Sequence, residues 1–242
     1  MKRIHIVLEA LDYNYLQNVK PPNIMKLDPH PAVTWGLGSR PATGAFLGGM
    51  LPICQIPNCY HRKIELNWCN PFFLTIMKQK TEKLFLLCAN GWSLELALPW
   101  IDKEQIKKNL EWIKFRPNQL AAEDMTTYFL EKQRKYKSYY AYIHFFETHY
   151  PFHAPNLPRN GKHRKEALLY VDEQVGRILK ECKDAYIVIS SDHNLPPRIV
   201  SAAFDVPAPQ TMLSFIATNF KEIPKTFEGN HIEFAESIWL NR

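Results

Sequence analysis

Continuous apolar runs recur along the chain and predict the strands of a sheet. They cover residues 3–10, 82–90, 139–146, 185–190 and 211–218. Polar residues interrupt these runs only rarely, whereas a strand with one solvated face would alternate polar and apolar positions. The pattern therefore predicts a sheet that is covered on both faces.

Helical patterns lie between these runs. From Leu168 to Ile178, apolar residues recur at the three- and four-residue spacing of one helix face, which predicts a helix over 164–183. Further helices are predicted over 71–80, 102–115 and 121–136. Apolar strands that alternate with helices indicate an α/β fold with a mostly parallel sheet.

Residues 39–52 carry the start and stop signals of one more helix. Ser39 precedes it, Pro41 stands just inside it, and glycines and a proline follow it. The stretch before it, residues 20–35, is rich in proline and polar side chains and is predicted to be a loop.

The chain has 242 residues, which is enough for one large domain, and we expect 1–242 to fold as a single unit. Its net charge is +6, and basic residues gather only at 159–165. Such a cluster is typical of a solvated loop, so we expect a small anionic substrate and no nucleic-acid partner.

No apolar run approaches the length of a membrane span, so none is expected. The N-terminal apolar stretch is interrupted by His5 and Glu9 and is not interpreted as a signal peptide. The five cysteines have irregular spacing without a Cys-x-x-Cys pair, which predicts reduced thiols in a cytoplasmic protein.

Polar side chains follow several of the predicted strands at the point where each strand ends. They are Glu9, Asn90, Glu147, His149, Asp192 and His193. In parallel sheets, ligands bind outside the carboxyl ends of the strands, so these residues should converge. Ser39 would stand at the start of its helix, at an end that suits an anion. The set contains metal ligands and a possible nucleophile.

Five segments carry the motifs of one protein group. "HIVLEALDYNYL" ends a first strand in an acid, and "SRPATGAFLGGMLP" has a hydroxyl residue two positions before proline. "EKLFLLCANGW" is a strand that leads into Asn-x-Trp, and "YIHFFETHYPF" is a strand that ends in His, an acid and His-x-Pro. A helix with Tyr-x-Asp-x-x-x-Gly leads into "SDHN". In this order, the segments resemble the alkaline phosphatase and sulfatase superfamily, most closely its sulfatase-type branch.

The resemblance implies an alkaline phosphatase-like fold, a three-layer α/β/α sandwich, with a reduced C-terminal subdomain in this short chain. It implies one divalent metal ion, whose ligands are Glu9, Ser39, Asp192 and His193. It places His144 and His149 on the substrate side, and Arg198 and His231 are further candidates for substrate binding.

The acid at position 9 resembles that of phosphoglycerol and phosphoethanolamine transferases, which pair glutamate with a hydroxyl nucleophile around manganese or zinc. Carboxylate, imidazole and hydroxyl donors suit these two ions better than calcium, although calcium and magnesium stay open. The expected function is that of a metal-dependent hydrolase or transferase acting on a phosphate ester, with Ser39 as nucleophile and His149 as acid for the leaving alcohol.

Two other functions stay open. A sulfatase would need a formylglycine motif, but Thr43 stands where that motif has arginine, and Asn194 replaces the usual glycine after Asp-His. A non-catalytic binding or scaffold module of the same fold is the other alternative. Single residues also have simpler interpretations: Ser39 as a helix N-cap, His144 as a packed core histidine and Asp172 as a structural residue.

Overall fold

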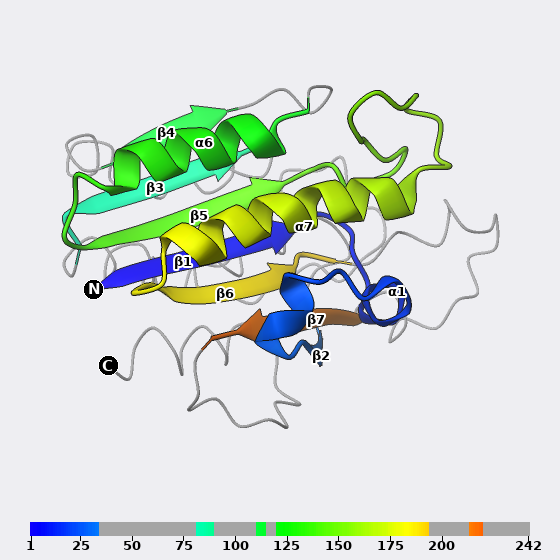
Figure 1. Cartoon of the computed structure of the whole chain (residues 1–242), viewed down its shortest axis with the longest axis horizontal. Coiled ribbons are helices and arrows are strands. Elements are labelled where there is room, and N and C mark those ends of the chain that lie inside the picture. Colours follow the sequence, from blue (N-terminus) through cyan, green and yellow to red (C-terminus); the bar gives the residue numbers. More distant parts are fainter. Residues whose placement is uncertain (34–80, 90–109, 115–119, 194–212, 220–242) are drawn as a thin grey trace, which may run out of the picture.

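The computed structural model describes residues 1–33, 81–89, 110–114, 120–193 and 213–219, which form a seven-stranded sheet with helices packed against it (Figure 1). The strands are β1 (Lys2–Leu8), β2 (His30–Val33), β3 (Lys83–Cys88), β4 (Leu110–Lys114), β5 (Tyr139–Phe145), β6 (Tyr186–Ser191) and β7 (Leu213–Thr218). The helical elements are α1 (Tyr13–Val19), the short 3₁₀ helix η1 (Ile24–Leu27), α6 (Ala122–Gln133) and α7 (Arg164–Glu181).

The strand order is β2-β7-β6-β1-β5-β3-β4. The five strands from β6 to β4 pair in parallel, whereas β7 pairs antiparallel with both β6 and β2. β1 lies in the middle of the sheet, between β5 and β6. The predicted mostly parallel α/β sheet is therefore confirmed.

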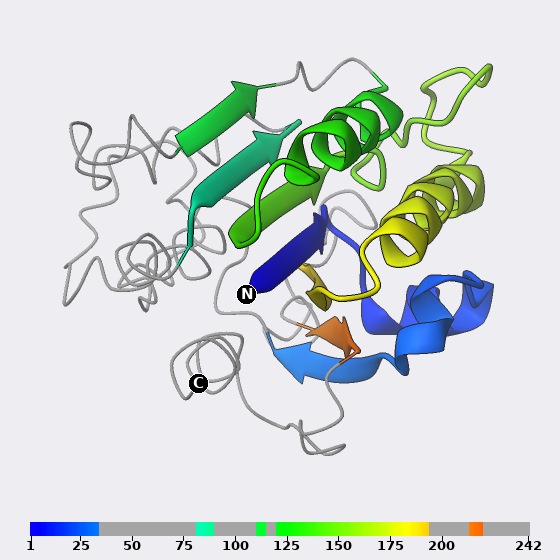
Figure 2. The same cartoon turned by 60° about the vertical axis from the view of Figure 1, so that its left-hand side comes forward.

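One face of the sheet is apolar and packs against α6 and α7, which lie on the same side in both views (Figure 2). Alternate strand residues such as Ile6, Ile143 and Ile189 point into this layer, where they meet Phe129 of α6 and Val175 of α7. All five side chains are fully buried. Each contributes about 1.5–3 kcal/mol through removal from water, so this layer is the core.

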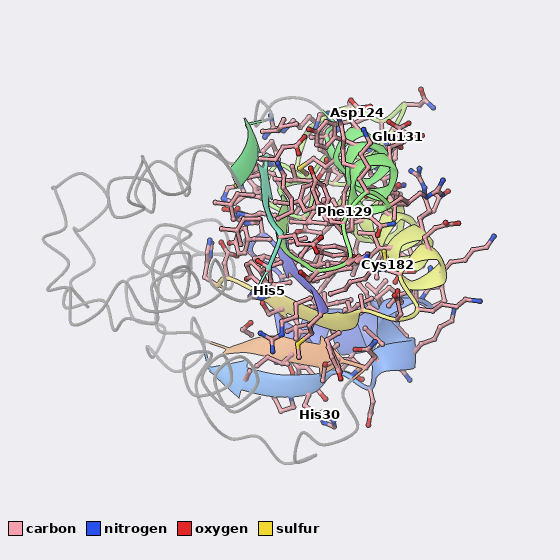
Figure 3. All side chains as sticks on the ribbon, turned by 90° about the vertical axis from the view of Figure 1, so that its left-hand side faces the viewer. His5, His30, Asp124, Phe129, Glu131 and Cys182 are labelled. Atoms are coloured by element: carbon pink, nitrogen blue, oxygen red, sulfur yellow. The ribbon has the colours of Figure 1, made fainter. Side chains whose placement is uncertain are left out.

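The opposite face carries the other half of each strand, and there the buried residues include many polar ones. Arg3 and His5 of β1, His144 of β5 and Ser190 of β6 are all buried. Figure 3 shows His5 on this side of the sheet, away from Phe129 and Cys182 on the helix side. Side chains alternate between faces along a strand, so the polar set forms one surface of the sheet.

Two predictions differ from the structure. Residues 110–114 of the predicted helix 102–115 form β4, because this segment pairs with β3 at the sheet edge. The predicted loop 20–35 contains η1 and β2, and Pro31 is accommodated because β2 is itself an edge strand. Residues 102–109 and the predicted helices 39–52 and 71–80 lie outside the described residues.

The Tyr-x-Asp-x-x-x-Gly motif of α7 (residues 170–176) binds the segment that precedes β2. Asp172 on α7 accepts hydrogen bonds from the backbone N–H groups of Asn23 and Ile24, at 3.1 and 2.8 Å. Gly176 leaves room for the Asn23 side chain, since a Cβ at this position would lie 2.6 Å from its Nδ2. Asp172 is therefore structural, as predicted.

Candidate metal centre

The sheet register brings three side chains to one place. Leu8 on β1 pairs with Ser191 on β6 and with Phe145 on β5, so Glu9 and Asp192 follow at the same level. His144 stands one residue before Phe145, on the face to which Glu9 and Asp192 also point. The centre therefore forms where three central parallel strands end.

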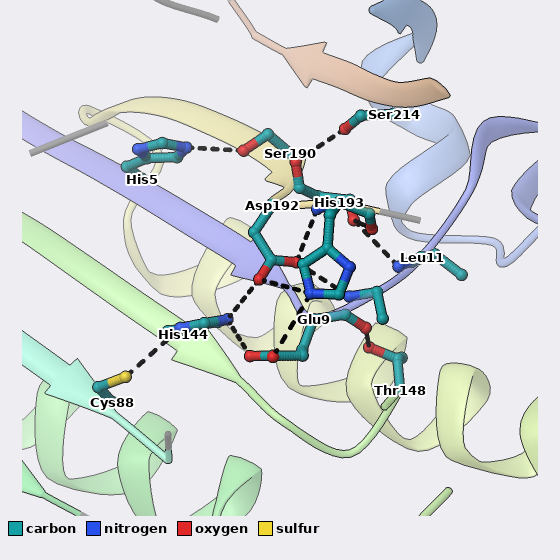
Figure 4. A network of polar contacts seen from close by, with 12 residues as sticks. His5, Glu9, Leu11, Cys88, His144, Thr148, Ser190, Asp192, His193 and Ser214 are labelled. Carbon is teal, nitrogen blue, oxygen red and sulfur yellow. Dashed lines mark hydrogen bonds and ion pairs between the residues drawn. The ribbon is translucent and has the colours of Figure 1, made fainter. Parts of the chain in front are cut away.

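The polar atoms of these side chains point toward one another (Figure 4). Nε2 of His144 lies 2.7 Å from Oε2 of Glu9 and 3.8 Å from Oδ2 of Asp192. His193 adds a second imidazole, whose Nε2 lies 3.4 Å from Oδ2 of Asp192 and 3.8 Å from Oε1 of Glu9. All four residues are buried.

Burial and mutual contact shift the protonation of these groups. Burial by itself would raise the pKa of Glu9, but His144 and His193 outweigh it and hold that pKa well below its usual value. Burial raises the pKa of Asp192, and the charge of Glu9 adds to the effect while His193 opposes it. The two carboxylates thus need positive charge close by, from protonated imidazoles or from a cation.

The donor set fits a divalent transition metal ion. One donor atom each from Glu9, His144 and Asp192 can be chosen so that all three lie within 4.8 Å of one another. Ligands about 2.1 Å from an ion lie about 3.0–3.4 Å apart in octahedral or tetrahedral geometry, and the observed separations of 2.7–3.8 Å bracket this range.

Hydrogen bonds to the backbone fix the Asp192 carboxylate and the main chain at Glu9. Oδ1 of Asp192 accepts hydrogen bonds from the N–H groups of Ala10 and His193, each at 2.9 Å, which leaves Oδ2 toward the imidazoles. The hydroxyl of Thr148 donates to the carbonyl oxygen of Glu9 at 2.6 Å. Ala10 has a left-handed backbone, with φ 54°, at the sharp turn that follows β1.

One side of the centre is lined by the segment that follows β5. The ring of His149 stacks on Phe146 with centroids 4.8 Å apart and lies 6.5 Å from the ring of His193. The guanidinium of Arg159 lies over the other residue of this stack, 5.9 Å from the Phe146 centroid. The His149 ring thus lies close to His193, and the Arg159 guanidinium lies near the Phe146 ring on which His149 stacks.

Five of the predicted site residues lie in the described part of the chain. Glu9, Asp192 and His193 come together, and His149 lies next to them. His144, predicted on the substrate side, contacts the two carboxylates. Ser39, Arg198 and His231 lie outside the described residues, as do Thr43, Asn90 and Asn194.

Glu147 belongs to the helix rather than to the centre. Its Oε1 accepts hydrogen bonds from the N–H groups of Ala121 and Ala122 at the start of α6, at 2.7 and 2.8 Å. Burial raises the pKa of this carboxyl. From the sequence, Arg159 belongs only to the basic cluster at 159–165, and its contact with Phe146 is a property of the fold.

The chain forms a mostly parallel sheet with buried carboxylates and imidazoles at the carboxyl ends of its strands. Comparisons with solved structures find the same kind of α/β fold. The chain is similar to yidJ of Bacteroides fragilis, a candidate sulfatase, with a TM-score of 0.66, 14% identity and coverage of 98% of this chain and 73% of that one. It is similar to the phosphoglycerol transferase GacH of Streptococcus pyogenes, in complex with sn-glycerol-1-phosphate, with a TM-score of 0.61, 13% identity and the same coverages.

A protein in the alkaline phosphatase superfamily from Vibrio parahaemolyticus matches with a TM-score of 0.60 and 14% identity, over 96% of this chain and 64% of that one. No protein-family model matches the chain, and no curated protein matches its sequence. The chain has the alkaline phosphatase-like α/β fold, and the resemblance inferred from the sequence is confirmed at that level. It spans about two thirds of the length of these proteins. In the part of the chain that the structure describes, no helix is long and apolar enough to cross a membrane.

Proposed function

We propose that the chain is a metal-dependent enzyme that acts on a phosphate ester, by hydrolysis or by transfer to an acceptor. The observation that carries this proposal is the buried group of Glu9, His144 and Asp192, with His193 beside it. Two buried carboxylates within reach of two imidazoles are costly to maintain without a cation or protons between them. A binding or scaffold module would have no need of such a group.

Each side chain has a role that follows from its position. Glu9 and Asp192 would supply the negative charge that holds a cation, and the Nε2 atoms of His144 and His193 would supply neutral donors. A divalent cation held by these residues would supply positive charge to neutralise the charge on transferred phosphoryl oxygens. Ser39 remains the proposed nucleophile, on the strength of its motif.

Two side chains outside the buried group, His149 and Arg159, form what we call the rim. Their proposed role is to act on the rest of the substrate. His149 is the proposed acid for the departing alcohol, and its partly exposed position close to His193 supports this role. Arg159, which lies over Phe146, is the proposed cation that binds an anionic ester. Its charge suits an anionic substrate, as does the net charge of +6.

A phosphate ester is favoured over a sulfate ester. The similar GacH structure contains a glycerol phosphate, and Thr43 departs from the motif that formylglycine formation needs. A sulfatase remains the second candidate, because yidJ is a candidate sulfatase of similar fold.

The experiment combines metal analysis with three chromogenic substrates. Protein purified without chelator is analysed by mass spectrometry for bound metal, then assayed with p-nitrophenyl phosphate, bis-p-nitrophenyl phosphate and p-nitrophenyl sulfate, each with added manganese or zinc. We expect one bound divalent ion and turnover of a phosphate ester. Turnover of the sulfate alone, with formylglycine at position 39, would identify a sulfatase. Absence of both metal and turnover would leave only the scaffold interpretation.

A further inference from the structure

The buried thiol of Cys88 lies against the second ring nitrogen of His144. Cys88 is the last residue of β3 and pairs with His144 on the neighbouring strand β5, so both side chains point to the same face. Its Sγ lies 3.4 Å from Nδ1 of His144, within the range of a sulfur hydrogen bond. Figure 4 shows the thiol on the opposite side of the ring from the two carboxylates.

A neutral imidazole carries one N–H group, and a metal ligand must offer its other nitrogen without a proton. If Nε2 of His144 faces a cation between Glu9 and Asp192, its proton must lie on Nδ1 and needs an acceptor there. Among the described residues, Cys88 is the partner found at Nδ1. Both side chains are fully buried, so water does not readily take this role.

We infer that Cys88 is a positioning residue that holds His144 in its Nδ1–H form and so directs Nε2 at the cation. The inference rests on the proposed function, because it requires His144 to be a ligand. A thiol suits this place because sulfur both donates and accepts. Without the cation, the S–H group can donate to Nδ1 while Nε2 carries the ring proton and faces Oε2 of Glu9. With the cation, the sulfur accepts from Nδ1–H.

The role differs from that of a nucleophile. A cysteine, a histidine and a carboxylate in line would resemble the catalytic group of thiol hydrolases. The Cys88 side chain is fully buried within the end of β3, however, and has no exposed surface from which to reach a substrate.

The test measures metal affinity and the protonated nitrogen rather than turnover. Zinc and manganese affinities are determined by titration for the wild type, Cys88→Ala and Cys88→Ser. Loss of a partner that orients a ligating histidine lowers metal affinity about 10–100-fold, and we expect this for Cys88→Ala. Cys88→Ser keeps a donor and acceptor and should lose less. Cys182→Ala is the matched control, since Cys182 is equally buried but lies on the helix side of the sheet. Its affinity should equal that of the wild type.

A second measurement needs no variant and so remains available if Cys88→Ala does not fold. Nitrogen-15 NMR of histidine-labelled wild type, loaded with cadmium, should show the His144 ring with a proton on Nδ1 and cadmium coupling on Nε2. A proton on Nε2, or equal affinities for Cys88→Ala and the wild type, would overturn the role of Cys88 while leaving the proposed function standing. A wild type that binds neither zinc nor manganese would overturn both.

Discussion

Replacing Glu147 tests how much this side chain stabilises the start of helix α6. Its carboxylate accepts the N–H groups of Ala121 and Ala122, and both residues are fully buried. Glu147→Ala leaves two buried donors without their partner, and each costs about 1–3 kcal/mol, so the free energy of unfolding should fall by about 2–6 kcal/mol. For a chain of this size, that corresponds to about 4–24 °C in melting temperature.

Two further variants make the measurement specific. Glu147→Gln keeps a carbonyl oxygen for the two N–H groups and should lose less than half as much. Glu123→Ala removes an acid from the first turn of the same helix, but one that is exposed, and should change the free energy of unfolding by about 0.5 kcal/mol or less. Urea denaturation at neutral pH, followed by circular dichroism, gives all three values.

The same residue makes a prediction about pH. Burial raises the pKa of Glu147 above its ordinary value of 4.5, so the folded protein holds this proton more tightly than the unfolded chain does. The contribution of Glu147 to stability is therefore greatest below about pH 4.5 and decreases as pH rises through the folded pKa. Because Glu147→Gln does not titrate, its stability relative to the wild type should improve over that window. If Glu147→Ala proves as stable as Glu123→Ala, the assigned cap is wrong.

Three more predictions concern the centre and its rim. Asp192→Ala should lower metal affinity at least about 100-fold and abolish turnover, because it removes a buried carboxylate that two imidazoles face. Metal analysis after gel filtration measures the loss, and full retention of metal would contradict the prediction. Ser39→Ala should retain the metal while turnover disappears; wild-type rates would exclude Ser39 as the nucleophile. Arg159→Ala should lower kcat/KM for an anionic ester about 10–100-fold, through loss of a charge-assisted hydrogen bond. The matched variant Arg134→Ala, at an exposed ion pair with Glu181, should leave kcat/KM unchanged, and equal effects of the two arginines would refute a direct role for Arg159.

The sheet could be predicted from the sequence because its central strands are almost wholly apolar. The runs at 3–10, 139–146 and 185–190 match β1, β5 and β6 to within two residues at each end, and the helical spacing at 164–183 matches α7. β4 could not be predicted, because residues 110–114 also fit a helical pattern and only their pairing with β3 decides the outcome. Pairing partners distant in sequence leave no local signal.

The residues of the candidate centre could also be predicted only in part. Glu9, Asp192 and His193 could be identified because each directly follows a strand, and parallel strands end at a common edge. His144 lies inside a strand, where a histidine is usually a packed residue. Its place in the centre depends on the side-chain alternation and register of β5 against β1, which together direct its ring toward Glu9. That register is a property of the assembled sheet.

The central position of β1 has a consequence for synthesis of the chain. Its two neighbours are β5 and β6, and β6 does not end until Ser191. On the ribosome, more than a hundred residues are made after β1 before either partner strand exists, and parallel pairing over such separations is slow. An apolar segment that stays unpaired for so long is exposed to aggregation, so newly made chains of this protein should depend on chaperones that shield β1 until β6 has left the exit tunnel.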